Sequence, residues 1–316
     1  MSFSIFTAYP RGYCAWVHRA VDMLMQVTRT YPSEKIYVNH EIIHNTFVIK
    51  MFERRGVVFQ SDLSKIPDSS LVVISAHGTG PTYFAALRAR NIRWIDATCP
   101  LVEKVHREAR DYIAKGYHIL YIGKKWHQEA VGVIDEGERH FTLIEKVEDV
   151  EKLTIDNWKL IIKNAKLALL TQTTLSVDDT ATLIAKIQEK FPHIVLPKAG
   201  DICYATTNRQ KAVKVLAKEC DTIFVVGSKS SSNSGKLRDV AEFLGKRAYL
   251  IEDASEIDPD WLQDSHTVWV TAGASGPEEL VEWVVEYLQT VGGIFDSELR
   301  VVEEKVEFPY KISINE

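Results

Sequence analysis

The chain has 316 residues, of which 46% are hydrophobic and 26% charged, and a formal net charge of −5. One hydrophobic core rarely serves a chain of this length, so two or three subdomains are expected. The negative charge argues against nucleic acid as the main partner, because phosphate backbones call for a basic face. The sequence has neither a run of eighteen apolar residues nor an N-terminal secretory pattern, so no membrane association is expected.

The cysteines are few and widely spaced. There are four, of which Cys14 is the first and Cys220 the last. This spacing does not resemble a secreted disulfide framework. We therefore expect a reducing, cytoplasmic compartment in which the thiols serve as ligands, nucleophiles or core residues.

The predicted elements follow one order that is repeated three times along the chain. Each copy has a short apolar strand, a cysteine and then a segment with apolar residues at helical spacing. Two further apolar strands follow, and each ends in a polar loop. The strand–cysteine pairs are 3–8 with Cys14, 92–95 with Cys99, and 194–196 with Cys203.

The six polar loops also match between the copies. The strands at 36–38, 119–122 and 223–226 run into loops with His44, His127 and Ser231, which lie 30, 28 and 28 residues after the cysteine of their copy. The strands at 71–75, 167–171 and 267–271 run into loops with His77, Thr173 and Ser275. Because these loops follow the carboxyl ends of strands, they occupy the position that holds working groups in open parallel sheets.

This alternation of strands and helices predicts an α/β fold with parallel sheets covered by helices. We expect three similar α/β domains in a pseudo-threefold trefoil, with the cysteines and polar loops facing one central cavity. The predicted domains are 15–97, 98–199, and 1–14 together with 200–290, followed by a C-terminal tail at 291–316.

The three repeated cysteines suggest a metal centre. An isolated cysteine is most often a small buried hydrophobe, and Cys220 fits this interpretation because it is predicted on an apolar helix face without a counterpart. Cys14, Cys99 and Cys203 share a position instead. A catalytic zinc ion with three thiolates stays open, although the CxxC pairs of structural zinc sites are absent. A four-iron cluster is favoured, because three irons take thiolates and the fourth can bind substrate.

The polar loops predict an anion site rather than a nucleotide site. The chain has no P-loop, and no GxGxxG motif follows a predicted strand. The hydroxyl, amide and imidazole donors of the loops suit a diphosphate, although the SSSNS run is also compatible with a flexible loop. Glu129 and Thr173 are candidates to pass a proton to a leaving hydroxyl. The candidate anion contacts are His44, His77, His127, Ser231, Ser232, Asn233 and Ser275.

With these residues assigned, the chain resembles the 4-hydroxy-3-methylbut-2-enyl diphosphate reductases, the LytB-type iron–sulfur enzymes that complete the non-mevalonate isoprenoid pathway. The matching segments extend in order to about residue 290, and they are PRGYCA, HEIIHN, SAHG, DATCPLV, TQTTLSVDDT, DICYATTNRQ, VVGSKSSSNS and VTAGAS. The resemblance implies a trefoil around a [4Fe-4S] cluster. It also implies reductive removal of the C4 hydroxyl, which gives isopentenyl and dimethylallyl diphosphates with two electrons and two protons.

The family motifs also imply a role for each matching residue. Cys14, Cys99 and Cys203 correspond to the cluster ligands. Glu129, Thr173 and His127 correspond to catalytic residues, and Thr173 joins the seven candidate anion contacts in binding the diphosphate substrate. The implied electron donor is a flavodoxin or a ferredoxin.

Three residues depart from the family pattern. Trp16 replaces a glycine that the family usually has two residues after the first ligand, and Gln128 replaces the proline of the HPE motif. Val131 replaces a second carboxylate. None of these changes removes a residue with an assigned chemical role.

Two other functions are compatible with three cysteines and an open iron. A cluster hydro-lyase, or a condensing enzyme similar to quinolinate synthase, would need no external electrons, so a requirement for reductant separates it from a reductase. An iron–sulfur sensor would need no diphosphate site. A change in the cluster spectrum on adding substrate would therefore count against a sensor.

Overall fold

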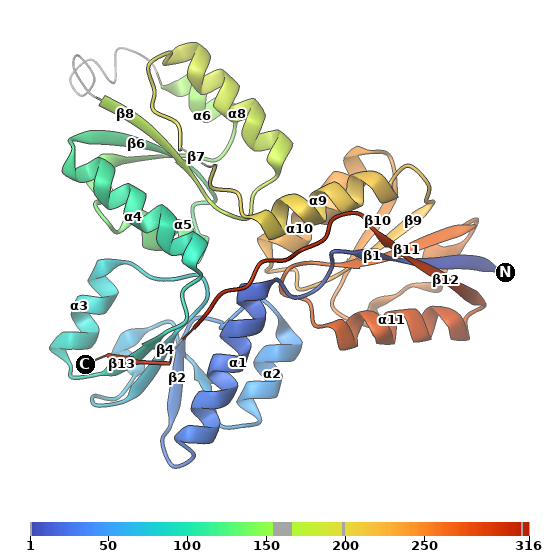
Figure 1. The fold of residues 1–316 in the computed structure, drawn as a ribbon, viewed down its shortest axis with the longest axis horizontal. Coiled ribbons are helices and arrows are strands. Elements are labelled where there is room, and N and C mark those ends of the chain that lie inside the picture. The colour runs from blue at the N-terminus through green and yellow to red at the C-terminus, as the bar shows by residue number, and fades with distance from the viewer. Residues whose placement is uncertain (1, 154–165, 198–199, 311, 316) are drawn as a thin grey trace. The chain divides into compact units, whose positions relative to one another are not determined.

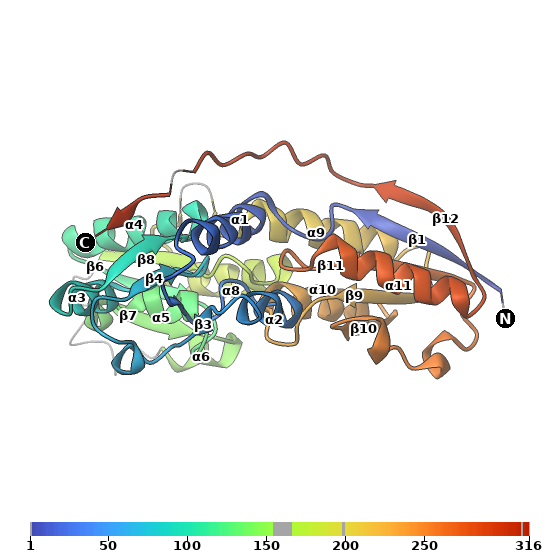
Figure 2. The same cartoon turned by 90° about the horizontal axis from the view of Figure 1, so that it is seen from below.

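The computed structural model describes residues 2–153, 166–197, 200–310 and 312–315 (Figures 1 and 2). The chain divides into two compact units: the first is Met1–Ser61 with Tyr204–Lys311, and the second is Asp62–Cys203 with Ile312–Glu316. Strands alternate with helices in both units, and the strands form three sheets in which parallel pairing dominates. The predicted α/β fold class is confirmed. The division into three domains stays a prediction.

The first unit contains a five-stranded parallel sheet in the order β10-β9-β11-β1-β12. Its strands are β1 (Phe3–Tyr9), β9 (Thr222–Val226), β10 (Arg247–Ile251), β11 (Thr267–Ala272) and β12 (Gly293–Arg300). Residues 293–300, which the sequence pattern assigns to the tail, thus form a strand that lies beside β1 in both views (Figures 1 and 2).

Helices cover both faces of this sheet. Figure 1 shows α9 (Tyr204–Leu216) and α10 (Ser232–Phe243) on one face and α11 (Glu278–Thr290) on the other. The alternation of β9 explains this arrangement: Val225 packs with the residues of α9 and α10, whereas Val226 packs with those of α11. A strand buried on both faces is apolar throughout, as the segment TIFVV is.

The rest of the first unit carries one candidate cysteine and one candidate histidine loop. Its remaining elements are α1 (Ala15–Thr30), β2 (Ile36–Asn39), α2 (Thr46–Glu53) and β3 (Val58–Phe59), and β2 pairs in parallel with β3. Cys14 precedes α1, and His44 lies between β2 and α2.

The second unit contains a parallel sheet in the order β7-β6-β8. Its strands are β6 (Tyr117–Ile122), β7 (Phe141–Ile144) and β8 (Lys166–Thr171). One face packs against α4 (Pro100–Ala114) and α5 (Gln128–Ile134), and the other against α6 (Val147–Lys152) and α8 (Val177–Lys190). The unit also has α3 (Pro81–Ala89) and a parallel pair, β4 (Leu71–Ile74) and β5 (Arg93–Asp96), with β13 (Ile314–Asn315) antiparallel to β5.

Short 3-10 turns connect several of these elements, at Leu63–Lys65, Glu138–His140, Ala254–Glu256 and Pro259–Leu262. Within the described part of the chain, no helix has both the length and the apolar character needed to cross a membrane.

The segment after β12 packs against the residues around Cys14. The Glu304 carboxylate pairs with the buried Arg209 guanidinium at 3.1 Å. The Phe308 ring meets the Trp16 ring edge-on, with 5.6 Å between centroids, and the Arg19 guanidinium lies over the Tyr310 ring. Trp16 is only 7% exposed. The bulky residue at this family glycine position is therefore accommodated by packing against the C-terminal segment.

Removing the Trp16 ring should therefore destabilise the fold. Trp16→Gly should lower the free energy of unfolding by roughly 3–5 kcal/mol, as deletion of a buried aromatic ring does. Phe308→Ala should cost less, and the double variant should reveal a coupling of about 0.5–1.5 kcal/mol between the two rings. Trp126→Gly is the control, because Trp126 is 83% exposed. Urea unfolding measures all four variants, and strictly additive losses would show that the rings do not interact.

Candidate active site

The three repeated cysteines occupy matching backbone positions. Cys14 and Cys99 are the N-cap residues of α1 and α4, each with extended backbone angles, and Cys203 directly precedes α9. Each thiol thus stands at the start of a helix, where the positive end of the helix dipole favours a thiolate.

The same hydrogen bond holds each cysteine. Its backbone N–H donates to a carbonyl two residues beyond the end of a parallel strand. The three bonds are Cys14 to Ala274 (3.2 Å), Cys99 to Ala76 (3.0 Å) and Cys203 to Thr173 (3.0 Å). The acceptors follow β11, β4 and β8, so the sequence repeat is present as a repeat of backbone geometry.

The donor set fits an iron–sulfur cluster. None of the three cysteines forms a disulfide bond, and none is fully buried. In the described residues, no three His, Cys, Asp or Glu side chains are grouped closely enough to hold one metal ion together. A cluster has no such requirement, because each thiolate binds a different iron. Cys99 and Cys203 belong to the second unit and Cys14 to the first, so convergence of all three stays a prediction.

The electrostatic surroundings of Cys14 are mixed. Burial raises the pKa of its thiol, whereas the Arg209 guanidinium and the N–H groups of Val17 and Trp16 lower it. The Val17 N–H lies 3.4 Å from the Cys14 sulfur. A thiolate at this position therefore has donors in place, although burial opposes its charge.

The first unit brings the predicted hydroxyl groups together. Ser231 caps α10, and its Oγ accepts from the Ser234 N–H at 3.3 Å. The Ser275 Oγ lies 3.4 Å from the Ser231 Oγ and 3.0 Å from the His44 carbonyl oxygen. The Asn233 Oδ1 accepts from the Ala274 N–H at 2.8 Å. Residues from three loops, at 44, 231–233 and 275, thus meet at the start of α10.

The SSSNS run forms the start of α10 rather than a flexible loop. Ser231, Ser232, Asn233 and Ser275 are each at most 7% exposed. Gly227 and Gly273 directly follow β9 and β11, and a Cβ on either glycine would collide with the Ser234 side chain. Glycine is therefore required for these two strand ends to approach the helix.

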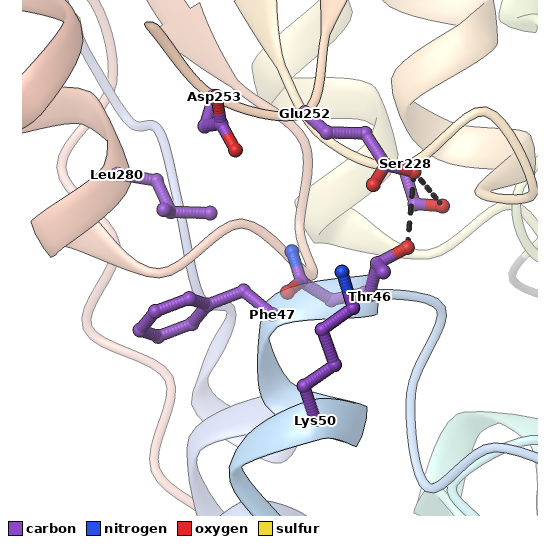
Figure 3. A pocket seen from close by; sticks show the side chains of 8 residues that line it. Thr46, Phe47, Lys50, Ser228, Glu252, Asp253 and Leu280 are labelled. Carbon is purple, nitrogen blue, oxygen red and sulfur yellow. Dashed lines mark hydrogen bonds between the residues drawn. The ribbon is translucent and has the colours of Figure 1, made fainter. Parts of the chain in front are cut away.

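A small cavity of about 80 Å³ lies beside the cluster (Figure 3). In the view of Figure 3, Glu252 lies beside Ser228 and above Thr46, and its Oε1 accepts from the Thr46 Oγ1 at 3.0 Å and the Ser228 Oγ at 3.1 Å. Thr46 follows the His44 loop and Ser228 precedes Ser231. Glu252 therefore links the two loops that carry candidate anion contacts. The sequence pattern did not indicate it, since it lies in none of the matching segments.

The second unit contains the predicted proton-transfer pair. Glu129 is 2% exposed. Its Oε1 accepts from the Thr173 N–H at 2.7 Å, and its Oε2 from the Thr173 Oγ1 at 2.9 Å. Burial raises the pKa of Glu129 to about 7; the Thr173 hydrogen bonds oppose this rise, and the nearby Asp201 carboxylate adds to it. Near neutral pH, part of the population therefore holds a proton next to the Thr173 hydroxyl.

The two candidate histidines of this unit, His77 and His127, lie along the same chain of contacts. His127 caps α5, and its Nδ1 accepts from the Glu129 N–H at 3.2 Å. The His77 ring meets the His127 ring edge-on at 5.9 Å between centroids. Cys203 continues the chain, because its N–H bonds the Thr173 carbonyl. His77, His127, Glu129, Thr173 and Cys203 are thus contiguous.

The two departures near this site leave it intact. Gln128 is the first residue of α5, a position that suits proline but does not require it. Val131 is 53% exposed, so the carboxylate that it replaces would point toward the surface of this helix.

Comparisons with known proteins agree with this geometry. A family model described as LytB protein matches residues 5–289. Relatives from Bordetella pertussis and Aromatoleum aromaticum, each named 4-hydroxy-3-methylbut-2-enyl diphosphate reductase, are 45% identical over 305 residues. These matches cover 96% of this chain in both cases, and 92% and 96% of the two relatives.

Two solved structures are also similar. The E-1-hydroxy-2-methyl-but-2-enyl-4-diphosphate reductase of Plasmodium falciparum matches with a TM-score of 0.93 and 35% identity, covering 99% of this chain and 96% of that one. An (E)-4-hydroxy-3-methyl-but-2-enyl diphosphate reductase, described as the terminal enzyme of the non-mevalonate pathway, matches with a TM-score of 0.63 and 29% identity, covering 92% and 99%. The resemblance inferred from the motifs is confirmed.

The buried Glu129 carboxyl should make stability depend on pH. Its pKa rises from an ordinary 4.5 to about 7 in the folded protein. Between these values the folded state keeps a proton that the unfolded state releases, so this group stabilises the fold most below pH 4.5 and loses its contribution as the pH rises through 7. The stability of the wild type relative to Glu129→Gln should fall by about 2–3 kcal/mol between about pH 5 and about pH 8.

Urea unfolding at both pH values tests this expectation. Glu286→Gln, at an exposed position of α11, is the control for loss of one carboxylate. A wild-type-to-Glu129→Gln difference that does not change with pH would show that Glu129 is not protonated in the folded protein.

Proposed function

The chain belongs to the LytB protein family, and we propose that it catalyses the reductive dehydroxylation of 4-hydroxy-3-methylbut-2-enyl diphosphate to isopentenyl and dimethylallyl diphosphates. This is the final step of the non-mevalonate isoprenoid pathway. The reaction replaces a C–OH bond by a C–H bond and releases water, and it consumes two electrons and two protons. The observation that carries the proposal is the buried Glu129–Thr173 pair next to Cys203.

Cys14, Cys99 and Cys203 would hold a [4Fe-4S] cluster. When bound, such a cluster supplies electrons and an open iron for the substrate hydroxyl. Three equivalent thiols at helix starts support this assignment over a structural zinc site, which needs four protein ligands. The predicted trefoil of three α/β domains would bring the three cysteines to one centre.

The diphosphate would bind at the start of α10. Short, uncharged side chains that can donate hydrogen bonds lie there, from Ser231, Ser232, Asn233 and Ser275. The N-terminus of the helix adds the positive end of its dipole. Hydrogen bonds to a charged phosphate are stronger than those between neutral groups, and burial strengthens them further. His44, His77 and His127 would supply imidazole donors around the same substrate.

Proton delivery would come from Glu129 through Thr173. A leaving hydroxyl departs as water only if it receives a proton, and the Glu129 pKa of about 7 lets this group hold one near neutral pH. The Thr173 Oγ1 lies 2.9 Å from the Glu129 Oε2 and can donate onward as it accepts. His127 would fix the orientation of the turn that carries Glu129.

The electrons would come from a small electron-transfer protein such as a flavodoxin or ferredoxin, in the cytoplasm. A cluster hydro-lyase needs no such donor, and a sensor needs no proton-transfer pair. The names of the relatives and the buried Glu129–Thr173 pair both favour the reductase.

Cysteine substitutions should distinguish the proposed cluster ligands from the core residue Cys220. Cys220 lies in an apolar core cluster after the end of α9 at Leu216, rather than on the helix as the sequence suggested, and burial raises the pKa of its thiol to about 11. Anaerobically purified Cys220→Ser should keep the brown colour and iron content of the wild type, whereas Cys99→Ser should lose both. Iron and sulfide analysis measures the difference, and a colourless Cys220→Ser protein would overturn the ligand assignment.

Proton transfer should fail when the relay is broken. Glu129→Gln keeps the hydrogen-bonding shape without the proton, so kcat should fall about 10²–10⁴-fold with little change in KM. Thr173→Val should behave similarly, and Thr173→Ser should retain turnover because it keeps the hydroxyl. Steady-state kinetics with a chemical reductant measures all three, and near-normal kcat in Glu129→Gln would remove this residue from the mechanism.

A further inference from the structure

An ion pair connects the helix that follows Cys99 with the loop that carries Cys203. Lys104 lies on α4, whose N-cap is Cys99. Its Nζ donates to the Asp201 Oδ1 at 2.8 Å, to the Gly200 carbonyl at 3.0 Å and to the Glu108 Oε2 at 3.3 Å. These bonds use all three ammonium donors.

The other oxygen of Asp201 reaches the end of β8. Its Oδ2 accepts from the Thr171 N–H at 2.8 Å, and Thr171 is the last residue of that strand. Two residues further along each segment, the Cys203 N–H bonds the Thr173 carbonyl. The Cys203 loop is therefore bonded twice to the end of β8 and, through Lys104, to α4.

Stability alone does not explain this pair. The Asp201 side chain is completely buried and that of Lys104 is 20% exposed. Removing a carboxylate and an ammonium from water costs several kcal/mol per ion, and apolar side chains of similar size often give equal or greater stability. The pair instead fixes relative position. The Lys104 ammonium and the two oxygens of Asp201 form directional hydrogen bonds that join three segments at defined points.

We infer that Lys104 and Asp201 are positioning residues that set the separation of Cys99 and Cys203 and hold Thr173 against Glu129. This role rests on the proposed function, since it concerns the cluster ligands and the proton-transfer pair. Neither residue touches the reacting atoms. Both act through the backbone of the segments they connect.

Lys104→Met tests this role, since methionine keeps the length of the side chain and removes its charge and donors. We expect the anaerobically purified variant to hold less iron than the wild type, to show an altered electron paramagnetic resonance spectrum after reduction, and to have kcat lowered about 10–100-fold, as for loss of partners behind metal ligands. Lys104→Arg should restore the wild-type spectrum at least in part.

A matched control is available in the same unit. Lys190, on α8, likewise donates through its Nζ to two backbone carbonyls, those of Val150 and Glu151, but it contacts neither cysteine loop. Lys190→Met should lower the melting temperature without changing iron content, spectrum or kcat. If Lys104→Met alters the spectrum while its melting temperature falls no further than that of Lys190→Met, a purely structural role is excluded.

Asp201→Asn is the second test variant, for use if Lys104→Met does not fold. It removes the charge but keeps the shape, and it should change the spectrum in the same direction. A wild-type spectrum, iron content and kcat in a folded Lys104→Met or Asp201→Asn protein would overturn the inference and leave the proposed function intact. A wild-type protein that holds no iron after anaerobic purification would overturn both.

Discussion

The hydrogen bond from each cysteine N–H to the carbonyl beyond a neighbouring strand is the constraint on which the candidate site depends. It fixes where the chain turns from a strand into a helix, and so it fixes where the thiol projects. The same bond recurs at Cys14, Cys99 and Cys203 with N–O distances of 3.0–3.2 Å. Parallel sheets make this possible, because the carboxyl ends of adjacent strands lie at one edge.

Burial determines the chemistry of the groups around these cysteines. Glu129 is acidic enough to give up a proton and basic enough to hold one near neutral pH, because desolvation raises its pKa while Thr173 keeps it hydrogen-bonded. The hydroxyls at the start of α10 are buried as well, so they are preorganised donors rather than solvated ones. One unit thus carries the proposed anion site, and the other the proposed proton donor.

Sequence reasoning succeeded where the signal was local and repeated. Cysteine spacing and the polar loops identified the strand ends, and the structure joins His44, Ser231 and Ser275 in one unit and His127, Glu129 and Thr173 in the other. The sequence pattern does not record pairing between distant segments. Residues 293–300, which it assigns to the C-terminal tail, pair with β1 as an edge strand.

By itself, the sequence determined the α/β class, the three equivalent cysteines and the family. Each of these depends on local periodicity or on motifs that can be recognised without a structure. Only the tertiary structure decided which polar and charged groups face one another. Lys104 and Asp201 are 97 residues apart, Thr46 and Glu252 are 206 apart, and Arg209 and Glu304 are 95 apart. No periodicity records such pairs, since each forms only when sheets and helices bring remote segments within hydrogen-bonding distance.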